Sequence, residues 1–312
     1  MSAAESVKVF APATVANVAS GFDVLGFALE RPGDLVELRR KEERRVTILS
    51  IDGDGGRLPL EVERNTAGVA ALSFLEAINF PFGLDIVLHK QMPLSSGLGS
   101  SAASSVAAVF GANLLAGSPL EKRQLLPFTL KAEEAACGTA HADNAAPALL
   151  GGFILIRSYE PLDVVRLPVP DGLAAAVAHP NTEVKTEDAR RILKKELRLT
   201  DAVRQWGNLA ALVAALYEGD LQLLGRSLQD VVAEPRRALL IPGFSGVKSA
   251  ALDSGALGSS ISGSGPSVFS LCPCLEVAGR VGAAMQEAFR RAGLESDLYV
   301  SRINSVGPVV VL

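Results

Sequence analysis

The sequence predicts a two-domain protein of the α+β class. Its 312 residues are more than one compact core usually needs and enough for two. The chain opens with strand-like segments, and helices and strands are mixed along the rest of it without an internal repeat. A segment rich in proline and turn residues, 159–172, interrupts this pattern near the middle. We therefore place a domain boundary there and expect domains at 1–164 and 165–312.

Hydrophobic periodicity and turn residues predict the elements in chain order. In the first domain we expect strands at 7–10, 35–40, 46–51, 84–89 and 153–156, with helices at 65–78 and 100–115. Ser118-Pro119-Leu120-Glu121 has the form of a helix capping box, so a further helix is expected to run from there toward Cys137, kinked or split at Pro127. In the second domain we expect strands at 174–178, at 267–271 and at the C-terminus, with helices at 186–197, 200–217, 221–232, 244–254 and 275–292.

Composition and charge argue against several classes of partner. The formal net charge of −4 and the pI near 5.6 give no sign of a polyanionic partner such as nucleic acid. The uncharged stretch 91–120 is interrupted by prolines, glycines and serines, so it does not predict a membrane span. The three cysteines have neither zinc-site nor C-x-x-C spacing, and the first strand leaves no room for a targeting segment before it, so we expect a cytoplasmic protein.

The strongest chemical signal is a glycine- and serine-rich loop at 93–103 that runs directly into a helix. The first turn of a helix offers unpaired backbone N–H groups and the positive end of the helix dipole, and both attract phosphate. Gly97 and Gly99 let the backbone approach a phosphate group, and Ser100 and Ser101 add hydroxyls. The loop lacks the lysine of a Walker A motif, but its G-x-G-x-x-A spacing also fits a dinucleotide fingerprint, although such a fingerprint follows its strand more directly. A turn that merely starts a helix is a further interpretation.

The loop, written P-x-x-x-G-L-G-S-S-A-A, resembles the ATP loop of the GHMP kinase family. Two further blocks fit in the expected order: residues 11–23 resemble the family's N-terminal substrate block, and residues 262–266 resemble its C-terminal glycine loop. The similarity covers nearly the whole chain. The blocks that are similar to the homoserine kinase branch of the family lie at 16–26, 141–152 and 233–244.

The resemblance implies a fold and an activity. The N-terminal domain is expected to resemble ribosomal protein S5 domain 2, and the C-terminal domain is expected to be ferredoxin-like. The implied reaction transfers the γ-phosphoryl group of ATP, with Mg²⁺, to the side-chain hydroxyl of L-homoserine, giving O-phospho-L-homoserine in threonine biosynthesis. A cytoplasmic homodimer that acts on this small molecule, and binds neither nucleic acid nor a membrane, is expected.

Homoserine is a zwitterion, so its site needs cations for the carboxylate and acceptors for the ammonium group. The resemblance implies that Arg190 and Arg237 bind the carboxylate, and that Asn17 and Asp23 lie on the ammonium side. Taken alone, the arginines could be solvated helix residues, and Asn17 and Asp23 could be turn formers. The resemblance also implies that His141, Asp143 and Thr186 bind the substrate. The catalytic residues that it implies are Asp143, Asn144 and Arg190.

Phosphoryl transfer depends on positioning and charge neutralisation more than on covalent chemistry. We expect Asp143 or Asn144 to orient the acceptor hydroxyl and assign no general base, although Asp143 could instead be a helix N-cap. Ser101 and Glu133 match the family's Mg²⁺ ligands, with Glu134 as a rival, and Mg²⁺ needs few protein ligands. The residues expected to bind the nucleotide are Asn65, Lys90, Pro93, Ser95, Ser96, Gly97, Leu98, Gly99, Ser100, Ser101, Ala102, Gly263, Ser264 and Gly265.

Three alternatives stay open at this point. Another GHMP kinase, acting on mevalonate or a sugar, would make the two arginines superfluous. A nucleotide-binding protein without turnover would not need the pairing of Ser101 with Glu133. A dinucleotide-dependent oxidoreductase would use the glycine loop alone.

Overall fold

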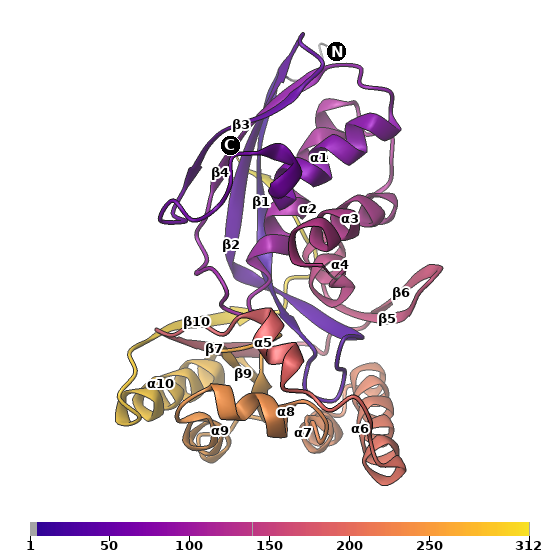
Figure 1. Ribbon diagram of the computed structural model, residues 1–312. Helices are drawn as coiled ribbons and strands as arrows, with labels where there is room; N and C mark the ends of the chain where they lie inside the picture. The colour runs from indigo at the N-terminus through magenta and orange to yellow at the C-terminus, as the bar shows by residue number, and fades with distance from the viewer. Residues whose placement is uncertain (1–4, 139, 312) are drawn as a thin grey trace.

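The computed structural model describes residues 5–138 and 140–311, which form two β-sheets with helices packed on them (Figure 1). The elements of the first half are β1 (Ser6–Ala16), β2 (Leu25–Lys41), β3 (Val46–Asp52), η1 (Val62–Arg64), α1 (Thr66–Ala77), β4 (Gly83–His89), α2 (Ser100–Leu115), η2 (Lys122–Leu125), α3 (Leu126–Cys137), α4 (Ala142–Leu150), β5 (Phe153–Tyr159) and β6 (Leu162–Leu167). Those of the second half are β7 (Ala174–Pro180), α5 (Thr186–Arg191), α6 (Leu199–Glu218), α7 (Leu221–Ser227), α8 (Glu234–Arg237), η3 (Ala238–Leu240), α9 (Phe244–Asp253), β8 (Gly258–Ile261), β9 (Val268–Cys272), α10 (Leu275–Arg291), β10 (Ser296–Arg302) and β11 (Val309–Val311).

The larger sheet is built around the long strand β2. Its strand order is β11-β1-β2-β4-β3, and the hairpin of β5 and β6 joins through the pairing of β5 with β2. β3 and β4 run parallel and are connected through α1, whereas the other pairs are antiparallel. The helices α1 to α4 lie together on one face of this sheet (Figure 1). The start of α2 therefore lies against the sheet, where strand residues can fix it.

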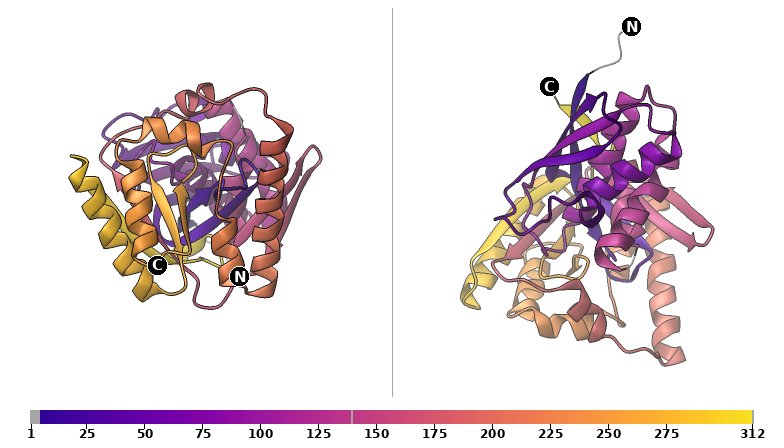
Figure 2. Two further views of the ribbon diagram at one scale, coloured as in Figure 1. Left: turned by 90° about the horizontal axis from the view of Figure 1, so that it is seen from below. Right: turned by 45° about the horizontal axis from the view of Figure 1, so that its top comes forward.

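The smaller sheet has the order β10-β7-β9-β8 and is antiparallel throughout. Its strand β7 is buried on both faces, with side chains that alternate between two hydrophobic cores. Ala175 and Val177 join the main core, whereas Ala174, Ala176 and Ala178 join a second core formed with α9 and α10. Helices α9 and α10 cover the outer face of this sheet, which is seen from below in Figure 2.

The two sheets share the main core. Phe27 of β2 packs against Phe153 of β5, with ring centroids 4.8 Å apart, and against Phe269 of β9, at 5.9 Å. The chain also returns to the larger sheet at its end, because β11 pairs with β1. The predicted boundary between residues 164 and 165 falls inside β6, and the division of the chain at that point stays a prediction.

Most predicted elements lie near the expected positions, and α2 has the predicted bounds. The capping box predicted at 118–121 is wrong. Ser118 adopts a left-handed conformation, with φ of 58°, and the capping box that forms joins Glu121 to Gln124 at the start of η2. None of the described helices combines the length and the apolar character that a membrane span requires.

A buried carboxylate joins β2 to the segment that precedes α2. Asp34 is fully buried and forms an ion pair with Lys90. Its carboxylate also accepts hydrogen bonds from Ser100 Oγ (2.8 Å) and from the backbone N–H groups of Gln91 (2.9 Å) and Met92 (3.2 Å). Asp34 therefore bonds to residues on both sides of the glycine-rich loop.

Lys90 completes this arrangement. Besides Asp34, its ammonium group donates to the backbone carbonyl of Ser100 (3.0 Å) and to Ser104 Oγ (2.7 Å). An ammonium group has three donors, and these three acceptors account for all of them. The ion pair thus fixes both ends of the loop at 93–99.

The Asp34→Ala variant should be strongly destabilised, because it leaves the Lys90 ammonium group buried without its counter-charge. We expect the free energy of unfolding, measured by urea denaturation, to fall by about 3–5 kcal/mol. The control is Lys8→Ala, which removes a half-exposed ion pair with Glu37 (2.7 Å) and should cost less than about 1 kcal/mol. Equal effects of the two substitutions would show that the buried pair does not hold the fold.

Candidate active site

A cavity of about 640 Å³ lies between the two halves of the fold. The start of α2 and the segment before α1 form one end of its lining, and α5, α8 and the 262–266 loop contribute from the second half. The predicted site residues that line the cavity are Asn17, Asp23, Asn65, Lys90, Ser95, Ser96, Gly97, Gly99, Ser100, Ser101, Ala102, Glu133, His141, Asp143, Asn144, Thr186, Arg190, Arg237, Gly263 and Ser264.

Three predicted residues are not part of this lining. Leu98 is fully buried in the main core, and Gly265 packs against Ile241, so both support the loops from behind. Pro93 also lies outside the lining. Any contact of these residues with a nucleotide stays a prediction.

The glycine loop needs glycine at two positions. Gly97 and Gly99 have left-handed φ values of 78° and 69°. A Cβ atom on Gly97 would lie 2.3 Å from the carbonyl oxygen of Ser262, and one on Gly99 would lie 2.2 Å from Thr14 Oγ1. Gly99 is also the N-cap of α2, so no side chain caps the first-turn N–H groups of residues 100–102, which line the cavity. These groups can bind the oxygens of a phosphate.

The second half of the chain clamps this loop. Ser262 Oγ donates to the carbonyl oxygen of Gly97 (2.7 Å), and Ser267 Oγ donates to that of Ser96 (2.6 Å). The predicted C-terminal glycine loop therefore packs directly on the glycine-rich loop at 93–103. Residues from both halves of the chain fix the orientation of the loop's peptide groups.

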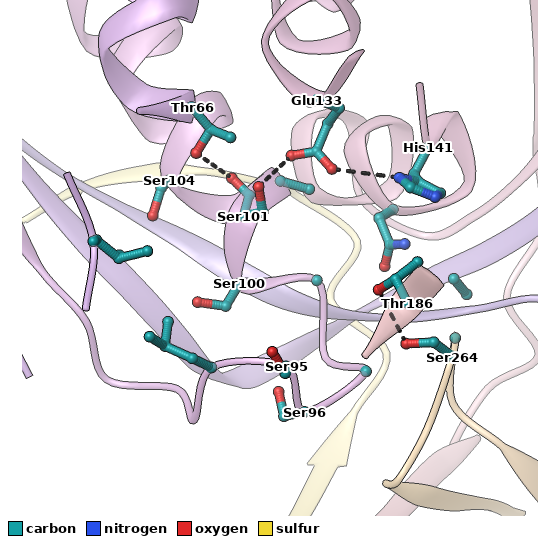
Figure 3. Close-up of a pocket in the computed structure, with 18 of the residues that line it drawn as sticks. Thr66, Ser95, Ser96, Ser100, Ser101, Ser104, Glu133, His141, Thr186 and Ser264 are labelled. Carbon is teal, nitrogen blue, oxygen red and sulfur yellow. Dashed lines mark hydrogen bonds and ion pairs between the residues drawn. The ribbon is translucent and has the colours of Figure 1, made fainter. Parts of the chain in front are cut away.

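Glu133 and Ser101 lie side by side at the edge of the cavity. Glu133 is buried, and its Oε1 accepts a hydrogen bond from Ser101 Oγ (2.7 Å), while its Oε2 lies 3.7 Å from His141 Nδ1 (Figure 3). Among the described residues there is no group of three or more metal-binding side chains, so an ion here would take its other ligands from phosphate and water. That ligand set suits Mg²⁺. The rival Glu134 is exposed on α3.

Asp23 and Arg190 form a bidentate ion pair at the other end of the cavity. Both guanidinium NH groups donate to the carboxylate, each at 3.0 Å. Tyr159 Oη donates to the backbone carbonyl of Asp23 (2.8 Å) and so holds the turn in place. Burial lowers the pKa of Arg190, but the neighbouring carboxylates outweigh it and raise that pKa, so the arginine keeps its charge.

Arg237 lies beside this pair. Its side chain is buried and donates to the carbonyl oxygens of Gly263 (2.8 Å) and Ala189 (3.2 Å). Both arginines lie over the ring of Phe22, with Arg237 Cζ 5.0 Å and Arg190 Cζ 6.0 Å from the ring centroid. The two guanidinium groups, which carry like charge, therefore both contact the ring of Phe22.

Asn17 shapes the turn that presents Asp23. Its Nδ2 donates to the carbonyl oxygen of Gly263 (2.8 Å), and its Oδ1 accepts from the backbone N–H of Asp23 (2.9 Å). Both residues have left-handed φ values, 69° and 58°. The turn-forming interpretation thus describes their backbone, and a role for Asn17 in contacting a ligand stays a prediction.

Two buried polar atoms at the cavity lack a hydrogen-bond partner within the part of the chain that the structure describes: Asp143 Oδ1 and Arg190 Nε. Buried polar groups are normally paired, so these atoms mark positions that a ligand can complete. Burial, together with the nearby Asp23 carboxylate, raises the pKa of Asp143 to about 6, although His141 and the Asn17 backbone partly offset the rise. Two carboxylates that repel each other form an attractive site for a cation.

Other predicted residues also have bonds within the protein. Asn65 is the N-cap of α1 and accepts hydrogen bonds from backbone N–H groups of its first turn. Asn144 Oδ1 accepts from Thr14 Oγ1 (2.8 Å), which leaves its amide N–H₂ group for other partners. Thr186 Oγ1 lies 3.5 Å from Ser264 Oγ on the opposite loop (Figure 3).

Sequence reasoning missed one wall of the cavity. It is formed by the segment that precedes α1, where two arginines flank a short apolar and acidic stretch. Because the neighbouring residues are rich in turn formers, the segment resembled an ordinary loop in the sequence. The lining residues from this segment are Arg57, Leu58, Pro59, Glu63 and Arg64, and Thr66 at the start of α1 adjoins them.

Comparison with known proteins identifies the family. The family model described as GHMP kinases N terminal domain matches residues 65–152, and the one described as GHMP kinases C terminal matches residues 212–291. A homoserine kinase from Chlorobaculum tepidum is 54% identical over 98% of each chain. The crystal structure of a homoserine kinase from Cytophaga hutchinsonii has a TM-score of 0.98 and 55% identity, covering 100% of this chain and 99% of that one.

More distant structures share the fold alone. A mevalonate kinase from L. major has a TM-score of 0.71 at 15% identity, over 95% of this chain and 96% of that one. The oxidoreductase alternative is wrong, since the predicted kinase fold is confirmed and the loop follows a strand of a largely antiparallel sheet. The chain therefore belongs to the GHMP kinase family, and it is an ATP-dependent small-molecule kinase.

Proposed function

We propose that the protein transfers the γ-phosphoryl group of ATP to the side-chain hydroxyl of L-homoserine, giving O-phospho-L-homoserine for threonine biosynthesis. The observation that supports this best is the acceptor end of the cavity, where Arg190 and Arg237 lie beside Asp23. Cations and an anion so close together suit a zwitterionic amino acid. The highly similar relatives that are named homoserine kinases support the same acceptor.

The acceptor would use the groups that the protein leaves incomplete. Its carboxylate would accept from Arg190 Nε and from the free donors of Arg237. Its ammonium group would lie toward Asp23 and Asp143, whose mutual repulsion it relieves. A mevalonate or sugar acceptor has no ammonium group for this position.

The nucleotide would lie against the first-turn N–H groups of α2. The triphosphate would be neutralised by the helix N-terminus and by Mg²⁺ held at Glu133 and Ser101, which lie 2.7 Å apart. Lys90 has no donor left, so its role is to hold the loop from beneath.

The hydroxyl would be aimed at the γ-phosphorus by Asp143 or Asn144, which both line the cavity near the start of α4. Phosphoryl transfer of this kind needs alignment and charge neutralisation, and we assign no general base. We also propose that the protein acts as a cytoplasmic homodimer and binds neither nucleic acid nor membranes. The net charge of −4 supports the absence of a nucleic-acid partner.

The substrate proposal is tested by coupled ADP release with homoserine, serine, threonine, mevalonate and galactose as acceptors. We expect kcat/KM for homoserine to exceed that for mevalonate and galactose by about a hundredfold or more, since those acceptors leave buried charges unpaired. A preference for either of them would overturn the proposal.

Replacing Glu133 by glutamine should weaken the use of Mg²⁺. We expect the Mg²⁺ concentration for half-maximal activity to rise about tenfold or more, with the KM for homoserine little changed, because a neutral amide is a poor ligand for this ion. The matched control is Glu134→Gln, one residue further on the same helix but exposed. Equal Mg²⁺ dependence in the two variants would remove Glu133 from the metal site.

The rate should depend on the charge of Asp143. Its pKa, raised to about 6, means that the carboxyl is neutral below pH 6 and charged above it. We therefore expect kcat/KM for homoserine to rise through a step near pH 6, which Asp143→Asn removes while the titration of ATP itself remains in both proteins. An unchanged turnover number and pH profile in the variant would exclude Asp143 from orienting the acceptor.

A further inference from the structure

The hairpin of β5 and β6 brings Tyr159 to the acceptor end of the cavity. Tyr159 is the last residue of β5 and lies outside the lining of the cavity. The strand that carries it packs beside α4 and pairs with β2 (Figure 1). The backbone N–H of Ile156 also donates to the carbonyl oxygen of Val24 (2.7 Å). The end of β5 is therefore fixed next to the turn that holds Asp23.

The Tyr159 hydroxyl joins two segments of the chain. It donates to the backbone carbonyl of Asp23 (2.8 Å). Burial raises the pKa of this phenol, as do the carboxylates of Asp143 and Asp23, and a hydrogen bond with the backbone of Ala142 partly offsets the rise. A hydrogen bond lowers the pKa of a phenol when the phenol oxygen accepts it, so the donor is the N–H group of Ala142. One hydroxyl thus connects the 17–23 turn with the first residue of α4.

These two segments carry two carboxylates that face each other at the acceptor end. Asp23 is the last residue of the turn, and Asp143 directly follows Ala142. Both side chains line the cavity, and burial together with the charge of Asp23 raises the pKa of Asp143. The two carboxylates repel each other, and the repulsion pushes the turn away from α4 unless bonds between the two segments resist it.

The backbones of the two segments are held in different ways. A Cβ atom on Gly26 of β2 would lie 1.8 Å from the carbonyl oxygen of Asp143, so β2 packs directly on the start of α4 and fixes it. The turn instead contains four non-glycine residues in the left-handed conformation, which side chains rarely adopt. Such a backbone keeps its shape only where surrounding bonds hold it, and the Tyr159 hydroxyl supplies one of them. The four residues are Asn17, Val18, Ala19 and Asp23.

We propose that Tyr159 is a positioning residue that sets the spacing between the Asp23 and Asp143 carboxylates, and thereby the selectivity of the site for an acceptor with an ammonium group. This inference rests on the proposed function, since the ammonium group is that of homoserine. An ammonium group binds both carboxylates only while they stay close enough to share it. The tyrosine acts through the backbones of both segments and does not touch the acceptor.

The Tyr159→Phe variant tests this inference because it removes the hydroxyl and keeps the ring. We expect the KM for homoserine to rise about fivefold or more, as the loss of such hydrogen bonds predicts. The KM for ATP and kcat should change little, because β2 still fixes the start of α4. For 4-hydroxybutyrate, which is homoserine without its ammonium group, kcat/KM should also change little, so the preference for homoserine falls. The control is Tyr217→Phe, the same change at an exposed residue of α6, which should leave all these values unchanged.

A second readout does not require turnover. The Asp143 carboxyl can be titrated by carbon-13 NMR of the free protein, with Asp143→Asn to assign its signal. In Tyr159→Phe the step near pH 6 should move to lower pH, because Asp23 then lies farther away and raises the pKa of Asp143 less. The other charged groups that face Asp143, on α4, α5 and α8, are His141, Arg190 and Arg237, and all three are present in both proteins.

The two readouts separate this inference from the proposed reaction. If the unmodified protein phosphorylates homoserine and Tyr159→Phe has the same KM, selectivity and carboxyl titration, the inference is overturned and the reaction stands. An equal loss of activity toward both acceptors in Tyr159→Phe would also contradict it, because a general structural defect does not distinguish them. If the unmodified protein does not phosphorylate homoserine, the proposed reaction fails, and the carboxyl titration alone decides whether Tyr159 sets the spacing.

Discussion

The buried ion pair of Asp34 with Lys90 is the constraint on which the end of the cavity at the start of α2 depends. It bonds to the residues just before the glycine loop and to the first turns of α2 just after it. Since the two paired side chains bond to both ends of the loop, they hold these ends at a fixed separation. Removing either charge would leave the other buried and unpaired. The loop between them can then keep the left-handed backbone that directs N–H groups into the cavity.

The acceptor end is built differently, from long-range contacts of the second half of the chain. The 262–267 loop bonds to the glycine-rich loop through two serines and to the turn that holds Asp23 through Asn17. Arg237 bonds to the same loop through the carbonyl oxygen of Gly263. One segment thus sets the distance between the two ends of the cavity. In-line phosphoryl transfer depends on this distance, because the reacting groups must be held in the right geometry. A small movement of this loop would change both ends together.

Local signals predicted the parts of this structure that depend on local chemistry. Helix α2 and the glycine loop follow from small residues, glycines and periodicity, and they lie where expected. The helix predicted at 221–232 instead ends at Ser227. The side chain of Asp230 accepts hydrogen bonds from the backbone N–H groups of residues 232, 233 and 234, and such bonds compete with helix formation. Asp34 was missed since, in sequence, it is part of a proline-glycine turn, and only the tertiary fold brings Lys90 to it. For the same reason the sequence did not reveal the structural bonds of Asn17 and Arg237.

We propose that one cavity holds a triphosphate at the start of α2 and an amino acid at Arg190 and Arg237. A crystal structure with a non-hydrolysable ATP analogue, Mg²⁺ and homoserine tests it most directly. We expect phosphate oxygens on the N–H groups of residues 97–102 and the homoserine carboxylate at Arg190 and Arg237. A triphosphate bound elsewhere, or homoserine remote from both arginines, would contradict it.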